Sequence, residues 1–124
     1  MLIEIDRQSE EPVIRQIVRQ IREAVAGGLL APGRELPSVR TLASDLEVNL
    51  NTVARAYRVL QDEGFVTIHG RSGVEVAAPA KRADAQTRMT LTNELRESLA
   101  RLRQAGVQIP QLRKLVRREI DGLS

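Results

Sequence analysis

The sequence predicts an α+β fold that is mostly helical, with a compact N-terminal domain and a two-helix C-terminal extension. Three observations predict it. Apolar residues recur at helical spacing in three N-terminal segments, two short β-prone runs flank a glycine-containing turn, and leucines recur at helical spacing near the C-terminus. We place the N-terminal domain at residues 1–78, a linker at 79–86 and the helical extension at 87–124.

The first predicted elements are a short strand and a long helix. Residues 2–6 alternate between apolar and charged side chains, which favours a strand. Pro12 suits the start of a helix, because its missing N–H would have no partner there, and Gly27 and Gly28 end that helix. The expected buried face of the helix consists of Ile14, Ile17, Val18, Ile21 and Val25.

Two shorter helices follow a turn-rich connector at residues 29–37. Ser38 is a suitable N-cap for a helix over 39–46, and Asn49 for a second helix over 50–63. Only a tight connection separates the two helices, and Gly64 stops the second. Their expected inward residues are Val39, Leu42, Ala43 and Leu46 in the first and Val53, Ala56, Tyr57 and Leu60 in the second.

A β-hairpin and a helical tail complete the chain. Residues 65–68 and 74–76 are β-prone and enclose a polar turn with two glycines, which indicates a hairpin. Beyond the linker, Gly106 and Pro110 separate two apolar helical stripes. Two short helices joined by a tight turn and followed by a hairpin are typical of a winged helix-turn-helix, in which the hairpin is the wing.

The second helix of such a motif reads the major groove of DNA with side chains near its N-terminus. Here that end offers Asn49, Leu50, Asn51 and Thr52, with Arg55 one turn later. Asparagine suits bidentate contact with adenine, and arginine suits guanine or a phosphate. The alternative for each residue taken alone is a plain structural role, with Asn49 as a cap and the others solvated.

Further DNA contacts are expected before this helix and in the wing. Arg40 lies in the first turn of the preceding helix, where the alternative is a surface salt bridge with Asp45 or Glu35. The wing tip suits the minor groove or its phosphates. The complete predicted DNA-binding set is Arg34, Ser38, Arg40, Thr41, Asn49, Leu50, Asn51, Thr52, Arg55, His69, Gly70, Arg71 and Ser72.

Charge and composition narrow the possible functions. Residues 1–79 carry nine arginines against eleven acids, so DNA binding by this part depends on the placement of single arginines and not on bulk charge. Residues 80–124 carry a net charge of +5, which either approaches flanking DNA or solvates the helices. With no cysteine, one histidine and no catalytic motif, we expect no enzyme, no metal site and no cofactor. Without a signal peptide or a long apolar run, we expect a cytoplasmic protein with no membrane partner.

Two segments, PGRELPSVRTLA and VNLNTVARAYRVLQDEG, resemble the signature of the GntR family of bacterial regulators. The early Ile-Asp, the NTVARAY run and the short tail resemble its YtrA-like subfamily. The resemblance implies DNA contacts at Arg40, Thr41, residues 49–52 and residues 69–72. There are two departures from the family pattern. Leu50 stands where the family often has a polar residue or proline, which puts base preference there in doubt, and no basic pair precedes Gly70, which implies weaker wing contacts.

The resemblance also implies two antiparallel tail helices that pack against a second copy of the chain. The alternative is that their apolar face folds back on its own N-terminal domain. The expected dimer contacts are Leu91, Leu95, Leu99, Leu102, Leu112, Leu115 and Val116. The tail is too short to enclose a ligand pocket of about 300 Å³ in one subunit, and the sequence names no effector.

The predicted function is therefore an operator-binding homodimer that represses transcription at a pseudo-palindromic site, with transporter genes as targets implied by the resemblance. Two other classes compete with it. A winged helix can be a protein-interaction or RNA-binding module, in which Asn51 and Arg55 would be unimportant. A nucleoid-type protein is disfavoured by the net charge of −2 over residues 1–79, because non-specific binders depend on phosphate neutralisation.

Overall fold

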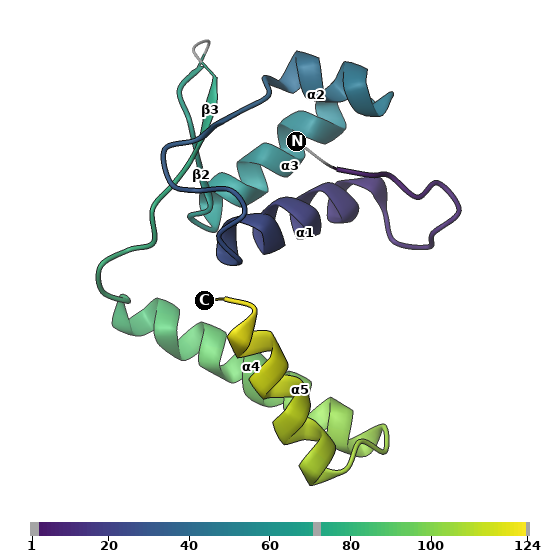
Figure 1. Cartoon of the computed structure of the whole chain (residues 1–124), viewed down its shortest axis with the longest axis vertical. Coiled ribbons are helices and arrows are strands. Elements are labelled where there is room, and N and C mark those ends of the chain that lie inside the picture. The colour runs from purple at the N-terminus through teal and green to yellow at the C-terminus, as the bar shows by residue number, and fades with distance from the viewer. Residues whose placement is uncertain (1–2, 71–72, 124) are drawn as a thin grey trace. The chain divides into compact units, whose positions relative to one another are not determined.

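The computed structural model describes residues 3–70 and 73–123 and divides the chain into two compact units, Met1–Pro79 and Ala80–Ser124 (Figure 1). The first unit contains the helices α1 (Val13–Ala26), α2 (Val39–Leu46) and α3 (Leu50–Asp62). Its strands are β1 (Glu35–Leu36), β2 (Val66–Ile68) and β3 (Val74–Val76), and the second unit contains α4 (Ala85–Gln104) and α5 (Ile109–Asp121). The mostly helical α+β class is thus confirmed.

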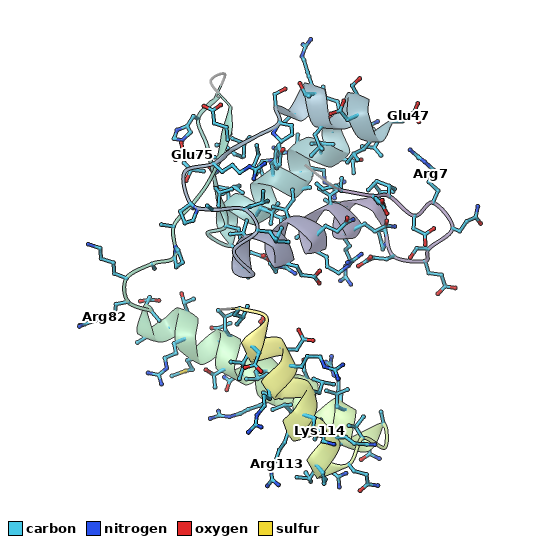
Figure 2. All side chains as sticks on the ribbon, in the orientation of Figure 1. Arg7, Glu47, Glu75, Arg82, Arg113 and Lys114 are labelled. Carbon is cyan, nitrogen blue, oxygen red and sulfur yellow. The ribbon has the colours of Figure 1, made fainter. Side chains whose placement is uncertain are left out.

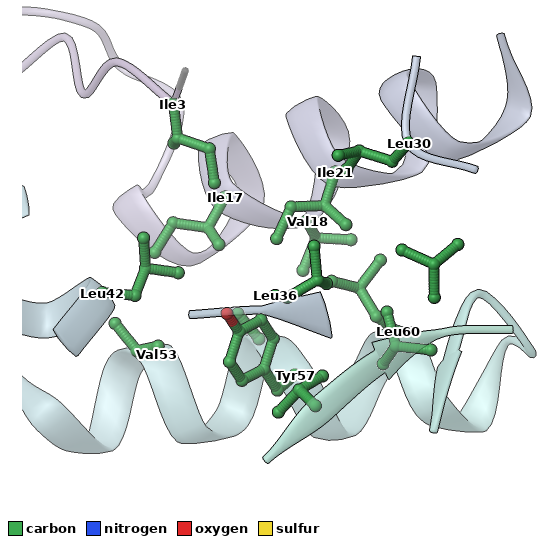
Figure 3. Packing of buried hydrophobic residues seen from close by; sticks show 14 of the residues in the cluster. Ile3, Ile17, Val18, Ile21, Leu30, Leu36, Leu42, Val53, Tyr57 and Leu60 are labelled. Carbon is green, nitrogen blue, oxygen red and sulfur yellow. The ribbon is translucent and has the colours of Figure 1, made fainter. Parts of the chain in front are cut away.

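The N-terminal core forms where α1 and α3 pack together and the sheet closes over them (Figure 3). Ile17, Val53, Ala56, Tyr57 and Leu60 are fully buried, as the helical spacing predicts. Burying one such aliphatic side chain stabilises the fold by about 1.5–3 kcal/mol. Tyr57 is the largest fully buried side chain, and the other buried hydrophobic residues of this core are aliphatic.

The predicted caps of α2 and α3 are confirmed. The Ser38 hydroxyl accepts a hydrogen bond from the Thr41 backbone N–H at 3.1 Å, and the Asn49 side-chain oxygen accepts one from the Asn51 N–H at 2.7 Å. Each side chain satisfies an N–H group that the first helical turn leaves without an intrahelical partner. The starts of both helices are therefore set by the sequence itself.

The sheet has a strand that the sequence does not predict. Its order is β1-β3-β2, with Leu36 opposite Val74 and Val66 opposite Val76, all antiparallel. β1 lies inside the segment that we interpreted as a connector. The sequence does not reveal it, because two strand residues between Pro32 and Pro37 are too few to show an alternating pattern. Pairing continues beside it, where the Val76 N–H donates to the Arg34 carbonyl at 2.9 Å.

The predicted strand at residues 2–6 is wrong for residues 3–6, which the structure describes without a strand. Two glutamines of α1 replace the partner strand. The Gln20 side chain exchanges two hydrogen bonds with the Glu4 backbone, at 2.8 and 3.0 Å, and the Gln16 side chain does the same with the Asp6 backbone. Because Gln16 and Gln20 are one helical turn apart, they match alternate residues of an extended segment.

Tyr57 connects α3 to the start of α2. Burial raises the pKa of its phenol, so the hydroxyl stays protonated and donates a hydrogen bond to the Pro37 carbonyl at 2.6 Å. That carbonyl immediately precedes the Ser38 cap. This hydrogen bond therefore links α3 to the start of α2, the two helices that form the helix-turn-helix.

The variant Tyr57→Phe is expected to lower the free energy of unfolding by about 1 kcal/mol, because the Pro37 carbonyl loses its donor while the ring stays packed. Urea unfolding followed by circular dichroism measures the change. An unchanged midpoint with an unchanged slope would show that this hydrogen bond does not contribute to stability.

The C-terminal unit is a helical hairpin with almost no interior. Asp84 caps α4 by accepting from the Thr87 N–H at 3.0 Å, and Gln108 and Gln111 form a capping box at the start of α5. Among the described residues of both helices, only Leu112 is buried. No helix within residues 3–70 and 73–123 is both long and apolar enough to cross a membrane.

Candidate nucleic-acid interface

The first turn of α2 presents a cation beside two hydroxyls. The Ser38 hydroxyl donates to the Thr41 hydroxyl at 3.0 Å, and all three side chains of Ser38, Arg40 and Thr41 are exposed. Arg40 has no hydrogen bond or ion pair with any residue that the structure describes, so the alternative of a salt bridge with Asp45 or Glu35 is not seen there. This turn is thus open to an anionic ligand.

The N-terminus of α3 separates its polar side chains from its buried ones. Val53 and Ala56 have no exposed surface, whereas Asn51 and Arg55 are exposed and Leu50 is 46% exposed. Within residues 3–70 and 73–123, the Asn51 carboxamide and the Arg55 guanidinium have no partner. Asn49 differs, because its oxygen is already used as the helix cap. Asn51 is therefore the asparagine whose side-chain donors and acceptor are all available, and Thr52 lies half-exposed beside it.

The wing is the hairpin of β2 and β3. The His69 N–H donates to the Gly73 carbonyl at 2.8 Å, and Gly70 and Gly73 have φ values of +58° and +121°, which favour glycine at the tip. The His69 imidazole lies 3.4 Å from the Glu75 carboxylate, and Glu75 is paired opposite Glu35. The predicted contacts Arg71 and Ser72 lie outside the described residues.

Arg34 lies in the connector before β1 and not on α2, α3 or the hairpin. Its exposed side chain lines a small hollow of about 280 Å³ together with residues of α1, the N-terminal segment and the connector. Its backbone extends the pairing of β1 with β3. The other described members of the predicted set lie on α2, α3, their caps and the hairpin, to which Arg34 is joined through its backbone.

The predicted dimer contacts divide into two groups. Leu99, Leu112 and Val116 line an apolar groove of about 780 Å³ between α4 and α5, which is an open channel and not an enclosed cavity. Leu91, Leu95 and Leu115 are exposed, and Leu102 is half-buried. The leucine stripe is therefore only partly covered within one chain.

The sequence profile described as "Bacterial regulatory proteins, gntR family" matches residues 13–76, just over half of the chain. The chain belongs to the GntR family. Among its relatives is the HTH-type transcriptional repressor YtrA of Bacillus subtilis, 36% identical over 94% of this chain and 90% of that protein. The resemblance to the GntR family and its YtrA-like members is thus confirmed.

Solved structures resemble this chain over most or all of its length. YtrA from Sulfolobus acidocaldarius has a TM-score of 0.64 and 40% identity, and the match covers 81% of this chain and 99% of that one. A structure from Listeria monocytogenes, described as a transcriptional antiterminator, has a TM-score of 0.85 at 28% identity over 100% and 94% of the two chains. The winged helix-turn-helix followed by a two-helix extension is therefore the fold of this GntR regulator.

Membership of the family gives the general activity. The GntR regulator is a DNA-binding transcriptional regulator, and its family and relatives are regulators and not enzymes. Among the residues that the structure describes, no group of three or more histidine or acidic side chains is arranged to hold a metal ion.

One contact near the interface is absent from the sequence prediction. The Arg7 guanidinium donates two hydrogen bonds, each of 2.9 Å, to the carbonyls of Leu46 and Glu47 at the turn between α2 and α3. The partners are 39 and 40 residues apart in the sequence, and Arg7 follows an irregular segment. No periodicity or motif signals such a contact.

Proposed function

We propose that this GntR regulator represses transcription as a homodimer that binds a pseudo-palindromic operator in double-stranded DNA. The proposal depends chiefly on the N-terminal end of α3, where Asn51 and Arg55 are exposed and have no partner among the described residues, while the opposite face is fully buried. A helix that is buried along one face and carries exposed polar side chains near its N-terminus on the opposite face fits the major groove.

Within this proposal each exposed group has a role that its chemistry allows. Asn51 reads adenine through two hydrogen bonds, Arg55 contacts guanine or a phosphate, and Leu50 contacts a thymine methyl group. The first turn of α2 binds the phosphate backbone, because its N–H groups and Arg40 favour an anion. The remaining proposed contacts are Ser38, Thr41, Asn49, Thr52 and the wing tip at residues 69–72, with Arg34 a backbone contact at the edge of the site.

A second copy of the chain is the proposed partner of the tail. The exposed leucines and the apolar groove support it, since a helical hairpin whose described residues include one buried side chain leaves most of its apolar surface in water. The proposed division is a DNA-binding domain at 1–78, a linker at 79–86 and a dimerisation tail at 87–124, and the compact units Met1–Pro79 and Ala80–Ser124 support it. Repression is supported by the name of the Bacillus subtilis relative, and transporter genes are the targets that the YtrA-like resemblance implies.

Selection of bound duplexes from a random DNA library tests the proposal with the full chain at about 150 mM salt. We expect one inverted-repeat motif, with half-sites about one helical turn apart, bound at least about 1,000-fold more tightly than random duplex. Because one structural neighbour is described as a transcriptional antiterminator, an RNA library is run in parallel. Recovery of an RNA motif only, or of no motif from folded protein, would contradict operator binding.

A further inference from the structure

We propose that the N-terminal arm, residues 3–7, holds the turn between α2 and α3 in place, and that Arg7 is a positioning residue for DNA reading. This inference rests on the proposed function, because it assigns Arg7 to the same reading surface. Arg7 itself is not proposed to touch DNA. It acts through the backbone of the turn that leads into α3.

The turn between α2 and α3 contains a residue in an unfavourable backbone conformation. Glu47 has a φ of +54°, a conformation that L residues rarely adopt. Among the residues that the structure describes, it is the only one other than glycine with a positive φ. It follows directly on the last residue of α2, where late carbonyls of a helix lack the next turn of N–H donors. Three residues later α3 begins, so the conformation at Glu47 sets where Asn51 lies.

Arg7 supports this turn. One guanidinium nitrogen, Nη2, donates to the Leu46 carbonyl and to the Glu47 carbonyl, both at 2.9 Å. Figure 2 shows Arg7 and Glu47 at the same end of the domain, with the arginine side chain directed toward the turn. A positive charge at the C-terminus of α2 also has the favourable sign for the helix dipole.

The arm that carries Arg7 is itself fixed to α1. Gln16 is only 2% exposed, and its side-chain amide bonds both the N–H and the carbonyl of Asp6, the residue next to Arg7. Gln20 holds Glu4 in the same way, and Ile3 is buried in the core. Because α1 also packs against α3, the arm and Arg7 link the α2–α3 turn to a helix that contacts α3 directly.

A competing role for Arg7 is a direct contact with a DNA phosphate. The two roles differ in their salt dependence. Loss of a phosphate contact makes the slope of log affinity against log salt concentration shallower by about 0.9 per site, or about 1.8 per dimer. It also weakens binding to every duplex. A lost positioning contact misplaces α3, so it weakens binding to the selected motif without changing the number of neutralised phosphates.

The experiment compares Arg7→Ala, Arg7→Lys and the control Arg15→Ala. Arg15 is an exposed arginine of α1 outside the proposed interface, so its replacement changes the net charge equally. Affinity for the selected motif and for a random duplex of equal length is measured between about 50 and 200 mM salt. For Arg7→Ala we expect the affinity for the selected motif to fall 10- to 100-fold and the affinity for the random duplex to stay within 2-fold of wild type. The change of affinity with salt concentration is expected to match that of Arg15→Ala. Arg7→Lys, which keeps the charge and one donor group, is expected to recover part of the loss.

A measurement without DNA separates this inference from the proposed function. In amide NMR spectra of the free chain, Arg7→Ala is expected to shift the signals of residues 47–51, whereas Arg15→Ala is expected to leave them in place. Unshifted signals would overturn the positioning role whatever the chain binds. Equal losses on both duplexes with a reduced salt slope would overturn it in favour of a phosphate contact.

Discussion

Replacing Asn51 with alanine is expected to abolish operator recognition while the chain stays folded. The Asn51 side chain is exposed and has no partner among the described residues, so its removal leaves no buried group unsatisfied in the free protein. A bidentate contact to a base provides about 1–3 kcal/mol of discrimination. Because a two-fold dimer uses the residue in both half-sites, the expected loss is about 2–6 kcal/mol, or about 30- to 10,000-fold in affinity.

Binding to the selected motif, measured by fluorescence anisotropy, checks the effect of Asn51→Ala. Arg40→Ala is measured in parallel, since Arg40 lies in the first turn of α2 on the same proposed surface. The matched control is Asn93→Ala, which removes an exposed asparagine of α4. Unchanged affinity in both Asn51→Ala and Arg40→Ala would exclude the α2–α3 surface as the part that reads DNA.

The double variant Leu91→Glu with Leu95→Glu is expected to convert the regulator to a monomer that binds DNA much more weakly. In one chain these side chains are 58% and 54% exposed, which leaves most of their apolar surface for a partner to cover in the proposed dimer. Completing the burial of four such leucines in a dimer contributes about 3–6 kcal/mol. Losing it raises the dissociation constant of the dimer by a factor on the order of 100 to 10,000, before the cost of buried carboxylates is added.

Sedimentation velocity measures the oligomeric state of this double variant. Gln86→Glu with Thr90→Glu is the matched control, because it adds the same charge to exposed positions on another face of α4. The control is expected to remain dimeric and to bind the operator. A dimer that persists in the leucine variant, with unchanged helix content, would show that this face folds onto its own chain or stays in water.

The helices of the N-terminal domain were predictable because at least two independent signals agree on each of them. Apolar spacing marks all three helices, the caps Ser38 and Asn49 mark the starts of α2 and α3, and glycines mark the ends of α1 and α3. α2 has the predicted bounds 39–46, and α3 ends one residue before the predicted position. Where local signals are consistent, burial in the core only reinforces them.

The two errors have a common physical cause. Residues 3–6 alternate like a strand but pair with glutamine side chains, and β1 lacks any period but pairs with β3. In both segments the partner decides the structure, and that partner is distant in the sequence. β-structure depends on such context more strongly than helix formation does.

The candidate site was predictable in its helical part only. Polar residues at the start of α3 and the cation in the first turn of α2 follow from helix geometry once the caps are placed. Arg7 does not follow from it, because its contact with the α2–α3 turn arises from the path of an irregular arm. The assignment of DNA-binding residues remains a prediction that the variants above test.

Among the described residues of the C-terminal hairpin, only Leu112 is buried. This affects how the amount of DNA-binding protein depends on the number of chains in the cell. On the proposed dimer, the tail gains its interior only when two chains meet, so folding of the tail and assembly of the regulator are one event. The amount of DNA-binding species at low abundance then rises with the square of the number of chains per cell. Control of the target genes is therefore expected to rise steeply with regulator abundance.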